Sequence, residues 1–175
     1  VAQLRILAEI AALTDEPATA TPLKLFVTNT LANPYADEEW IPGVLKPLAD
    51  SRRQANAIKR QENITVVIGN PPYKEKAKGK GGWIEAAGPN RKAALDSWMP
   101  PKEWGAGAHS KHLRNLYVYF WRWATWKVFG DGEPDEAELR ERGRALDRRG
   151  IVCFITVAGF LNGPGFQKMR SDLRK

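Results

Sequence analysis

The stretch ITVVIGNPPY, residues 64–73, decides how this chain folds. Its first six residues are mostly β-branched and apolar and end at Gly69, a pattern that predicts a buried strand. Two prolines follow at once. A proline lacks an N–H, fixes its own φ and restricts the residue before it, so the pair predicts a stiff turn. The stretch therefore predicts a rigid turn mounted at the carboxyl end of a strand.

Further along the chain in both directions, apolar runs alternate with helical patterns. LKLFVT at residues 23–28 and IVCFITV at residues 151–157 predict two more buried strands. Helical patterns surround the three runs, at residues 1–13, 47–61, 113–129, 133–149 and from 166 onward. Continuous apolar strands separated by helices predict an α/β fold, with a mostly parallel sheet and helices on both faces.

A short segment follows each predicted strand. They are Asn29–Leu31, Asn70–Tyr73 and Ala158–Asn162. Because ligands of open parallel sheets bind outside the carboxyl ends of the strands, we expect these segments to line one edge of the sheet.

Positive charge is concentrated after the turn. The 175 residues carry a formal net charge of +7, and residues 74–130 alone account for all of it. Residues 74–111 are rich in Lys, Gly and Pro and predict a long irregular loop, which in a compact domain is usually functional or disordered. Alternating lysines at its start predict contacts with nucleic-acid phosphates: Lys74, Lys76, Lys78 and Lys80.

Length and composition exclude several classes of protein. The length suggests one domain with a real core, and 43% hydrophobic residues exclude a disordered chain. A single cysteine, Cys153, argues against a disulfide framework and predicts a cytoplasmic protein. No apolar run approaches the roughly 20 residues of a membrane span, and no signal peptide is visible, so no membrane partner is expected.

The turn itself indicates a particular chemistry. The side-chain oxygen of Asn70 and the backbone oxygen of Pro71 are two acceptors held in place, with the aromatic ring of Tyr73 beside them. Two fixed acceptors suit a planar exocyclic amine, whose two N–H groups they can orient so that its lone pair faces an electrophile. A base carrying such an amine is inaccessible in a duplex and has to be flipped out. A plain Pro-Pro turn is the structural alternative.

The same residues resemble a known family. ITVVIGNPPY is similar to the catalytic strand and motif of the amino-group DNA methyltransferases that use S-adenosylmethionine. The flanking segments resemble large restriction–modification enzymes of that family, including those with a helicase-like region, at LKLFVTNTL, RNLYVYFWRWATWKV and RRGIVCFITVAGFLNGPGFQKMRSDLRK. The resemblance covers most of residues 1–175 and implies a Rossmann-like class I methyltransferase fold.

The resemblance also implies roles for individual residues. Asn70 and Pro71 would bind the N6 amine of adenine, Pro72 would shape the turn, and Tyr73 would stack on the flipped base. Asn29, Thr30 and Leu31, together with Asn70, would contact S-adenosylmethionine. The partner would be double-stranded DNA with a flipped adenine. No metal site is expected.

The glycine-rich cofactor loop of the family is not found. Val1 opens the chain directly in a helical pattern, and the last residues also look helical. We therefore expect an incomplete catalytic domain that needs the remainder of a parent polypeptide and is inactive alone.

Two other functions remain open. Enzymes that methylate a glutamine side-chain amide in proteins also use Asn-Pro-Pro-Tyr, since an amide nitrogen has the same two donors. A DNA-binding module derived from a methylase could retain the basic loop without catalysis.

Several other side chains have simpler explanations. His109 and His112 are expected at the surface, Cys153 in the core, and the aromatic residues of 120–126 in the core rather than stacked on bases. The acidic residues Glu85, Asp96 and Glu103 form no specific pattern for a metal or an acid–base site.

Overall fold

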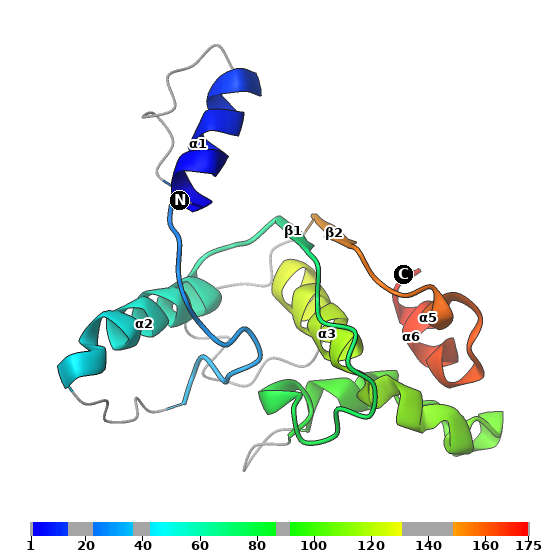
Figure 1. Cartoon of the computed structure of the whole chain (residues 1–175). Coiled ribbons are helices and arrows are strands. Elements are labelled where there is room, and N and C mark those ends of the chain that lie inside the picture. The colour runs from blue at the N-terminus through cyan, green and yellow to red at the C-terminus, as the bar shows by residue number, and fades with distance from the viewer. Residues whose placement is uncertain (1, 14–22, 37–42, 87–91, 131–148, 175) are drawn as a thin grey trace. The chain divides into compact units, whose positions relative to one another are not determined.

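The computed structural model describes residues 2–13, 23–36, 43–86, 92–130 and 149–174. The chain divides into two compact units, which are described separately (Figure 1). Unit 1 comprises Val1–Thr28 and Trp40–Ala55, and unit 2 comprises Asn29–Glu39 and Asn56–Lys175. The predicted charged helix at 133–149 lies almost entirely outside the described residues.

Unit 1 contains helix α1 (Ala2–Leu13), a short 3-10 turn (Gly43–Leu45) and the first part of helix α2 (Lys46–Gln61). Both helices confirm the predictions for residues 1–13 and 47–61. The predicted strand at residues 23–28 is wrong, because this segment has no strand structure.

The reason lies in the partners of the 23–28 backbone. Val27 donates its N–H to the hydroxyl of Ser51 at 2.7 Å, and the same hydroxyl lies 3.3 Å from the Val27 carbonyl oxygen. Leu25 and Val27 remain 57% and 70% exposed. An apolar run becomes a strand only where a neighbouring strand completes its hydrogen-bond ladder, and here a side chain takes that place.

Unit 2 is built around two parallel strands. β1 (Val66–Gly69) pairs with β2 (Ile151–Phe154), with Val66 opposite Ile151 and Gly69 opposite Phe154 (Figure 1). The predicted parallel pairing of these two runs is confirmed, although both strands are shorter than the runs that predict them. Helix α3 (Leu116–Phe129) lies between them in sequence, so the three elements form a strand–helix–strand crossover.

The two faces of this sheet differ. Helix α3 packs on one face, where the ring of Trp121 meets that of Phe154 edge-on at 5.1 Å. Side chains of the opposite face are open, with Ile68 77% and Ile151 61% exposed, and Cys153 is exposed with them. The prediction of fully buried strands and a core cysteine is therefore wrong. Within the described residues a helix covers only one face, and the alternation of side chains leaves every second residue unburied.

The core of unit 2 surrounds α3 instead. The described parts of the predicted long loop, residues 74–86 and 92–111, contain short 3-10 helices at Gly82–Ile84, Ala94–Trp98, Lys102–Trp104 and Gly107–Arg114, and the first, second and fourth of these contact α3. They contribute several buried apolar side chains to the core: Ala77, Trp83, Ile84, Leu95, Trp98. Burial of these residues removes a large apolar area from water, which explains why a Gly- and Pro-rich segment is ordered here.

A buried cation joins α3 to the end of α2. The ammonium group of Lys127 donates to the carbonyl oxygens of Lys59 at 2.8 Å and Glu62 at 2.5 Å, and lies 3.4 Å from that of Ile58. The last carbonyl groups of a helix have no partner within the helix, and a cation there also complements the helix dipole. This contact fixes the chain just before β1.

The chain ends in helix α5 (Gly159–Asn162), a 3-10 turn (Pro164–Phe166) and helix α6 (Gln167–Asp172). The guanidinium group of Arg170 holds them together by donating to the carbonyl oxygens of Phe160 at 2.8 Å and Gly163 at 2.7 Å. None of the helices within the described ranges is long and apolar enough to cross a membrane.

Candidate functional site

The Asn-Pro-Pro-Tyr turn begins directly after β1, at its carboxyl end. The ladder continues for one more bond beyond the strands, from the Ile155 N–H to the Gly69 carbonyl oxygen at 3.1 Å. Pro71 is buried, whereas Asn70, Pro72 and Tyr73 are exposed. Among the described residues no donor bonds the carbonyl oxygen of Pro71. The turn thus holds the Asn70 side chain and the Pro71 carbonyl oxygen at the carboxyl end of β1.

Tyr73 makes a contact that the sequence does not reveal. Its hydroxyl donates to the side-chain oxygen of Asn70 at 2.7 Å and lies 3.2 Å from the carbonyl oxygen of Ile155, just past β2. A carbonyl oxygen has two lone pairs, so the amide oxygen of Asn70 keeps one for a further donor. Tyr73 is predicted as a stacking ring, and in the structure it also orients the amide that it flanks.

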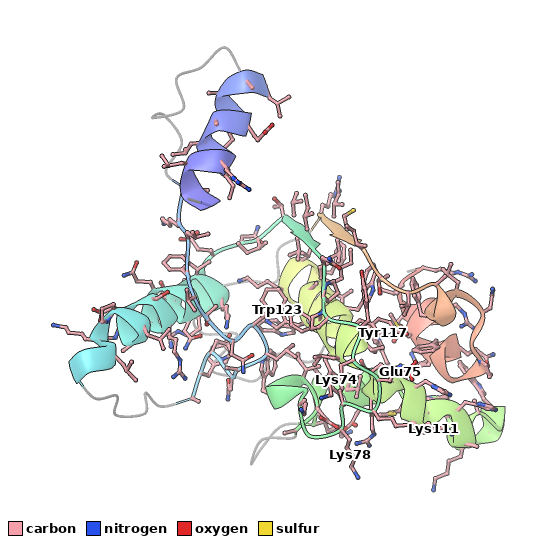
Figure 2. All side chains as sticks on the ribbon, viewed as in Figure 1. Lys74, Glu75, Lys78, Lys111, Tyr117 and Trp123 are labelled. Atoms are coloured by element: carbon pink, nitrogen blue, oxygen red, sulfur yellow. The ribbon has the colours of Figure 1, made fainter. Side chains whose placement is uncertain are left out.

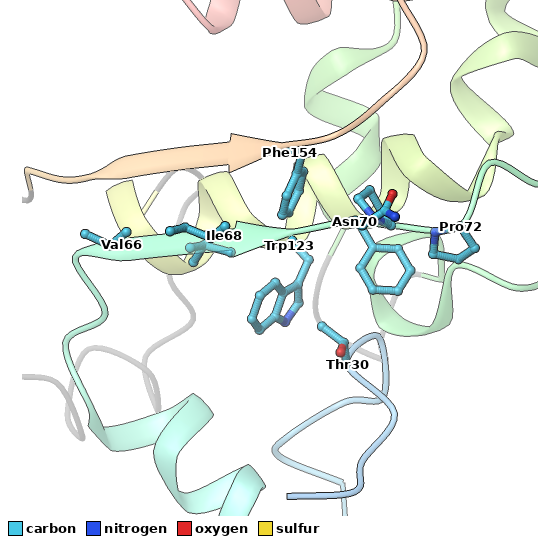
Figure 3. A pocket seen from close by; sticks show the side chains of 11 residues that line it. Thr30, Val66, Ile68, Asn70, Pro72, Trp123 and Phe154 are labelled. Carbon is cyan, nitrogen blue, oxygen red and sulfur yellow. The ribbon is translucent and has the colours of Figure 1, made fainter. Parts of the chain in front are cut away.

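A pocket of about 390 Å³ opens beside this turn (Figure 3). It brings together the end of β1, the turn, and residues of three other segments. The lining residues are Thr30, Val66, Val67, Ile68, Gly69, Asn70, Pro71, Pro72, Phe120, Trp123 and Phe154. Thr30 and Asn70, forty residues apart in the chain, therefore line the same pocket, although Thr30 follows no strand and no residue of Ala158–Asn162 lines it.

Aromatic rings form much of the wall. Phe120 and Trp123 come from α3 and Phe154 from the end of β2. The indole nitrogen of Trp123 is buried and has no hydrogen-bond partner among the described residues, and Figure 3 shows the nitrogen-bearing edge of this ring on the side of Thr30. The pocket is therefore lined by other atoms of the Trp123 side chain, not by this buried nitrogen.

Sequence reasoning missed this wall. It assigns the aromatic residues of 120–126 to the core. Trp126 at 2% exposed lies in the core, and Phe120 and Trp123 are partly buried against it while they also line the pocket. The signal that could have separated them is spacing. Phe120 and Trp123 stand three apart and share one face of the helix, at the level of the strand ends.

The three residues of the Asn29–Leu31 segment differ in whether they line the pocket. The side-chain oxygen of Asn29 accepts the Leu31 N–H at 3.0 Å, and the ammonium group of Lys59 donates to its backbone oxygen at 2.8 Å. Leu31 is only 3% exposed, and its carbonyl oxygen accepts the N–H of Trp83 at 3.3 Å. Of the three residues predicted to contact the cofactor here, only Thr30 lines the pocket. The other two shape its loop.

The basic segment after the turn is ordered by backbone contacts. Ala77 is fully buried and its N–H donates to the Arg114 carbonyl oxygen at 2.8 Å. The N–H of Lys76, a residue with the left-handed φ of 49°, donates to the side-chain oxygen of Asn115 at 3.1 Å. All four predicted phosphate-binding lysines are exposed. The backbone around them is hydrogen-bonded to the segment that leads into α3.

The side chain of Glu85 bonds the backbone of this segment. Its carboxylate accepts the N–H groups of Gly79 at 2.7 Å and Gly81 at 3.1 Å, and the guanidinium group of Arg114 at 3.2 Å. These contacts connect the backbone on both sides of Lys80 to the end of the 3-10 helix at Gly107–Arg114. No group of His, Cys, Asp and Glu residues in the described part of the chain could hold a metal ion. His109 and His112 are exposed and their rings stack at 6.5 Å.

Comparisons with protein-family models, with curated proteins and with solved structures found no match to this chain. The site is therefore interpreted from its own geometry.

Proposed function

We propose that this chain is the catalytic region of an S-adenosylmethionine-dependent adenine-N6 DNA methyltransferase of a restriction–modification protein, with a Rossmann-like class I fold. The observation that carries the proposal is the juxtaposition of two acceptors, Asn70 Oδ1 and Pro71 O, with an aromatic-walled pocket at the carboxyl end of β1. The β1–α3–β2 crossover supports the fold, because such units build parallel Rossmann-like sheets.

The pocket fits the planar adenine end of the cofactor. Phe120 and Trp123 offer apolar ring surfaces on which a planar base can stack. Thr30 offers a hydroxyl from the opposite loop. When bound, S-adenosylmethionine supplies an electrophilic methyl group. The proposal assigns only the adenine end to these residues, since the glycine-rich loop of the family is not found in the sequence.

The turn would hold the acceptor amine. The remaining lone pair of Asn70 Oδ1 and the carbonyl oxygen of Pro71 each accept one N–H of the exocyclic nitrogen, which directs its lone pair toward the pocket. Tyr73, at 44% exposed, supplies a ring surface for the flipped base while its hydroxyl fixes Asn70. Neutral acceptors suffice for this task, so no strong base is required.

The test uses the full-length protein, radiolabelled S-adenosylmethionine and duplex DNA of mixed sequence. We expect label in adenine N6 for the wild type and loss of at least about a hundredfold in rate for Asn70→Ala, the scale of removing one preorganised polar contact. Asn162→Ala is a matched control, because Asn162 is exposed at the end of α5 and outside the pocket. It should retain wild-type activity.

Three results would overturn the proposal. They are absence of DNA methylation by the wild type, equal methylation by Asn70→Ala, and label appearing in a glutamine-containing peptide instead of DNA. The last would identify the glutamine-amide reaction. Retained DNA binding without any methyl transfer would identify the binding-module alternative.

A further inference from the structure

The loop that carries Thr30 is a tight turn. The carbonyl oxygen of Asn29 accepts the N–H of Ala32 at 3.2 Å, and the side-chain oxygen of Asn29 accepts the N–H of Leu31 at 3.0 Å. Asparagine makes the second bond readily, because its side chain reaches the backbone two residues further on. Thr30 is therefore the first residue inside the turn, and its position depends on where Asn29 is held.

A buried lysine holds Asn29 from outside the turn. The ammonium group of Lys59, in the last turn of α2, donates to the Asn29 carbonyl oxygen at 2.8 Å and lies 3.5 Å from the side-chain oxygen of Asn56. Lys59 is only 6% exposed, and a charged group that is taken out of water needs such acceptors. This contact fixes the start of the turn to the end of α2.

The same end of α2 is connected to α3. The backbone carbonyl oxygen of Lys59 accepts the ammonium group of Lys127 at 2.8 Å. Helix α3 also carries Phe120 and Trp123, which form part of the aromatic wall of the pocket. The two lysines thus connect the helix that carries this wall with the turn that carries Thr30. Figure 3 shows Thr30 below the Trp123 ring in the same pocket, and Figure 2 shows the place of Trp123 on α3.

We propose that Lys59 is a positioning residue of this pocket, which keeps the hydroxyl of Thr30 where it bonds the cofactor. The inference rests on the proposed function in taking S-adenosylmethionine as the ligand. Lys59 itself does not line the pocket and acts through Asn29. A binding group whose place is fixed before the ligand arrives loses less conformational entropy on binding. Removal of the Lys59 ammonium group should therefore weaken cofactor binding, although the group does not contact the cofactor.

Isothermal titration calorimetry of the full-length protein with S-adenosylmethionine tests this role in a double-mutant cycle. Lys59→Met keeps a side chain of similar length without the ammonium group, and should raise Kd about fivefold, on the scale of one hydrogen bond. Thr30→Ala should raise Kd by a similar factor. The double variant should bind no more weakly than Thr30→Ala alone, because Lys59 acts through Thr30.

Arg60→Met is the matched control. Arg60 follows Lys59 in α2 and also donates to a backbone oxygen of the same segment, that of Pro34, at 3.0 Å. Pro34 lies outside the turn and does not line the pocket, so this variant should bind the cofactor as the wild type does. Circular dichroism checks the fold of each variant. If Lys59→Met does not fold, Lys59→Gln, whose side chain is shorter but polar, is measured in its place with the same expected loss.

Hydrogen exchange in the ligand-free protein gives a second measurement that needs no cofactor. The Leu31 N–H is bonded within the turn, so its exchange should become faster when the turn is no longer held at Asn29. We expect faster exchange at Leu31 in Lys59→Met and unchanged exchange in Arg60→Met. Equal exchange in wild type and Lys59→Met would show that Lys59 does not hold the turn.

The two proposals fail separately. If the wild type binds S-adenosylmethionine and Lys59→Met binds it equally well, or if the losses in the double variant are additive, the positioning role is wrong and the catalytic proposal stands. If the wild type neither binds the cofactor nor methylates DNA, while Lys59→Met alone has faster exchange at Leu31, Lys59 still positions the turn and the catalytic proposal falls.

Discussion

The hydroxyl of Tyr73 donates a 2.7 Å hydrogen bond to the side-chain oxygen of Asn70, three residues earlier in the same turn. The contact fixes the plane of the Asn70 amide and directs its second lone pair, while the nearby Ile155 carbonyl oxygen connects the turn to the end of β2. The Tyr73 hydroxyl therefore helps to hold the side-chain oxygen of Asn70 in place, in addition to any role of the Tyr73 ring.

Replacement of Tyr73 by Phe separates these two roles. Tyr73→Phe keeps the aromatic ring but removes the donor, so Asn70 loses its fixed orientation. We expect the methylation rate to fall about tenfold, corresponding to about 1.4 kcal/mol. Single-turnover kinetics with saturating DNA measures it. Tyr73→Ala, which also removes the ring, should lose considerably more. A Tyr73→Phe rate equal to that of the wild type would show that the hydroxyl contact has no part in positioning Asn70.

Substitution of Trp123 tests whether the pocket binds the cofactor. Trp123→Phe removes part of the aromatic wall, so the affinity for S-adenosylmethionine should fall about five- to tenfold, on the scale of a lost aromatic contact. Isothermal titration calorimetry of the full-length protein measures this change.

Trp121→Phe is the matched control for that experiment. The indole nitrogen of Trp121 is also buried and unpaired among the described residues, but the ring packs against Phe154 and Phe160 and does not line the pocket. Its variant should bind the cofactor as the wild type does. Equal losses for the two variants would indicate a general effect on α3 packing and count against a cofactor role for Trp123.

Gly82 is a strict requirement of the fold. It has the left-handed φ of 54°, and a methyl group added to it would lie 2.0 Å from the carbonyl oxygen of Leu31. Gly82→Ala should destabilise unit 2 by about 3 kcal/mol or more, because left-handed strain adds to a backbone clash. Gly107→Ala meets nothing within 4 Å and should change the free energy of unfolding little. Urea denaturation compares them, and equal midpoints would contradict the observed contact.

The raised pKa of Tyr117 predicts how the free energy of unfolding changes at high pH. Burial raises its pKa from 10.0 to about 12, the charge of Glu75 adds to the increase, and a hydrogen bond with Asn115 opposes it. The folded state therefore favours the neutral phenol, and the stability that this contributes is complete below pH 10 and is lost as the pH rises from 10 to about 12.

Tyr117→Phe should consequently reduce the alkaline loss of stability. The loss should not disappear, because burial also raises the pKa of Tyr119. Urea denaturation of both proteins between pH 9 and about pH 12 gives the two profiles. Profiles of identical slope would show that the phenol of Tyr117 ionises equally well in the folded and unfolded protein.

Some features of the fold follow from local pattern. The apolar runs of β1 and β2, their parallel pairing, and helices α2 and α3 are predicted because period and composition at these positions agree with the final structure. The run at 23–28 also has local preferences for a strand, yet Val27 bonds Ser51. Strand formation depends on a partner that local sequence does not specify.

In the candidate site, too, some features follow from local sequence and others depend on tertiary contacts. The sequence by itself determined the rigid turn at Asn70–Tyr73, because proline geometry is local, and it determined that positive charge follows. Only the tertiary structure decided that Thr30 and Trp123 share a pocket with this turn. These contacts join segments distant along the chain, and burial of the core around α3, rather than any local preference, fixes their positions.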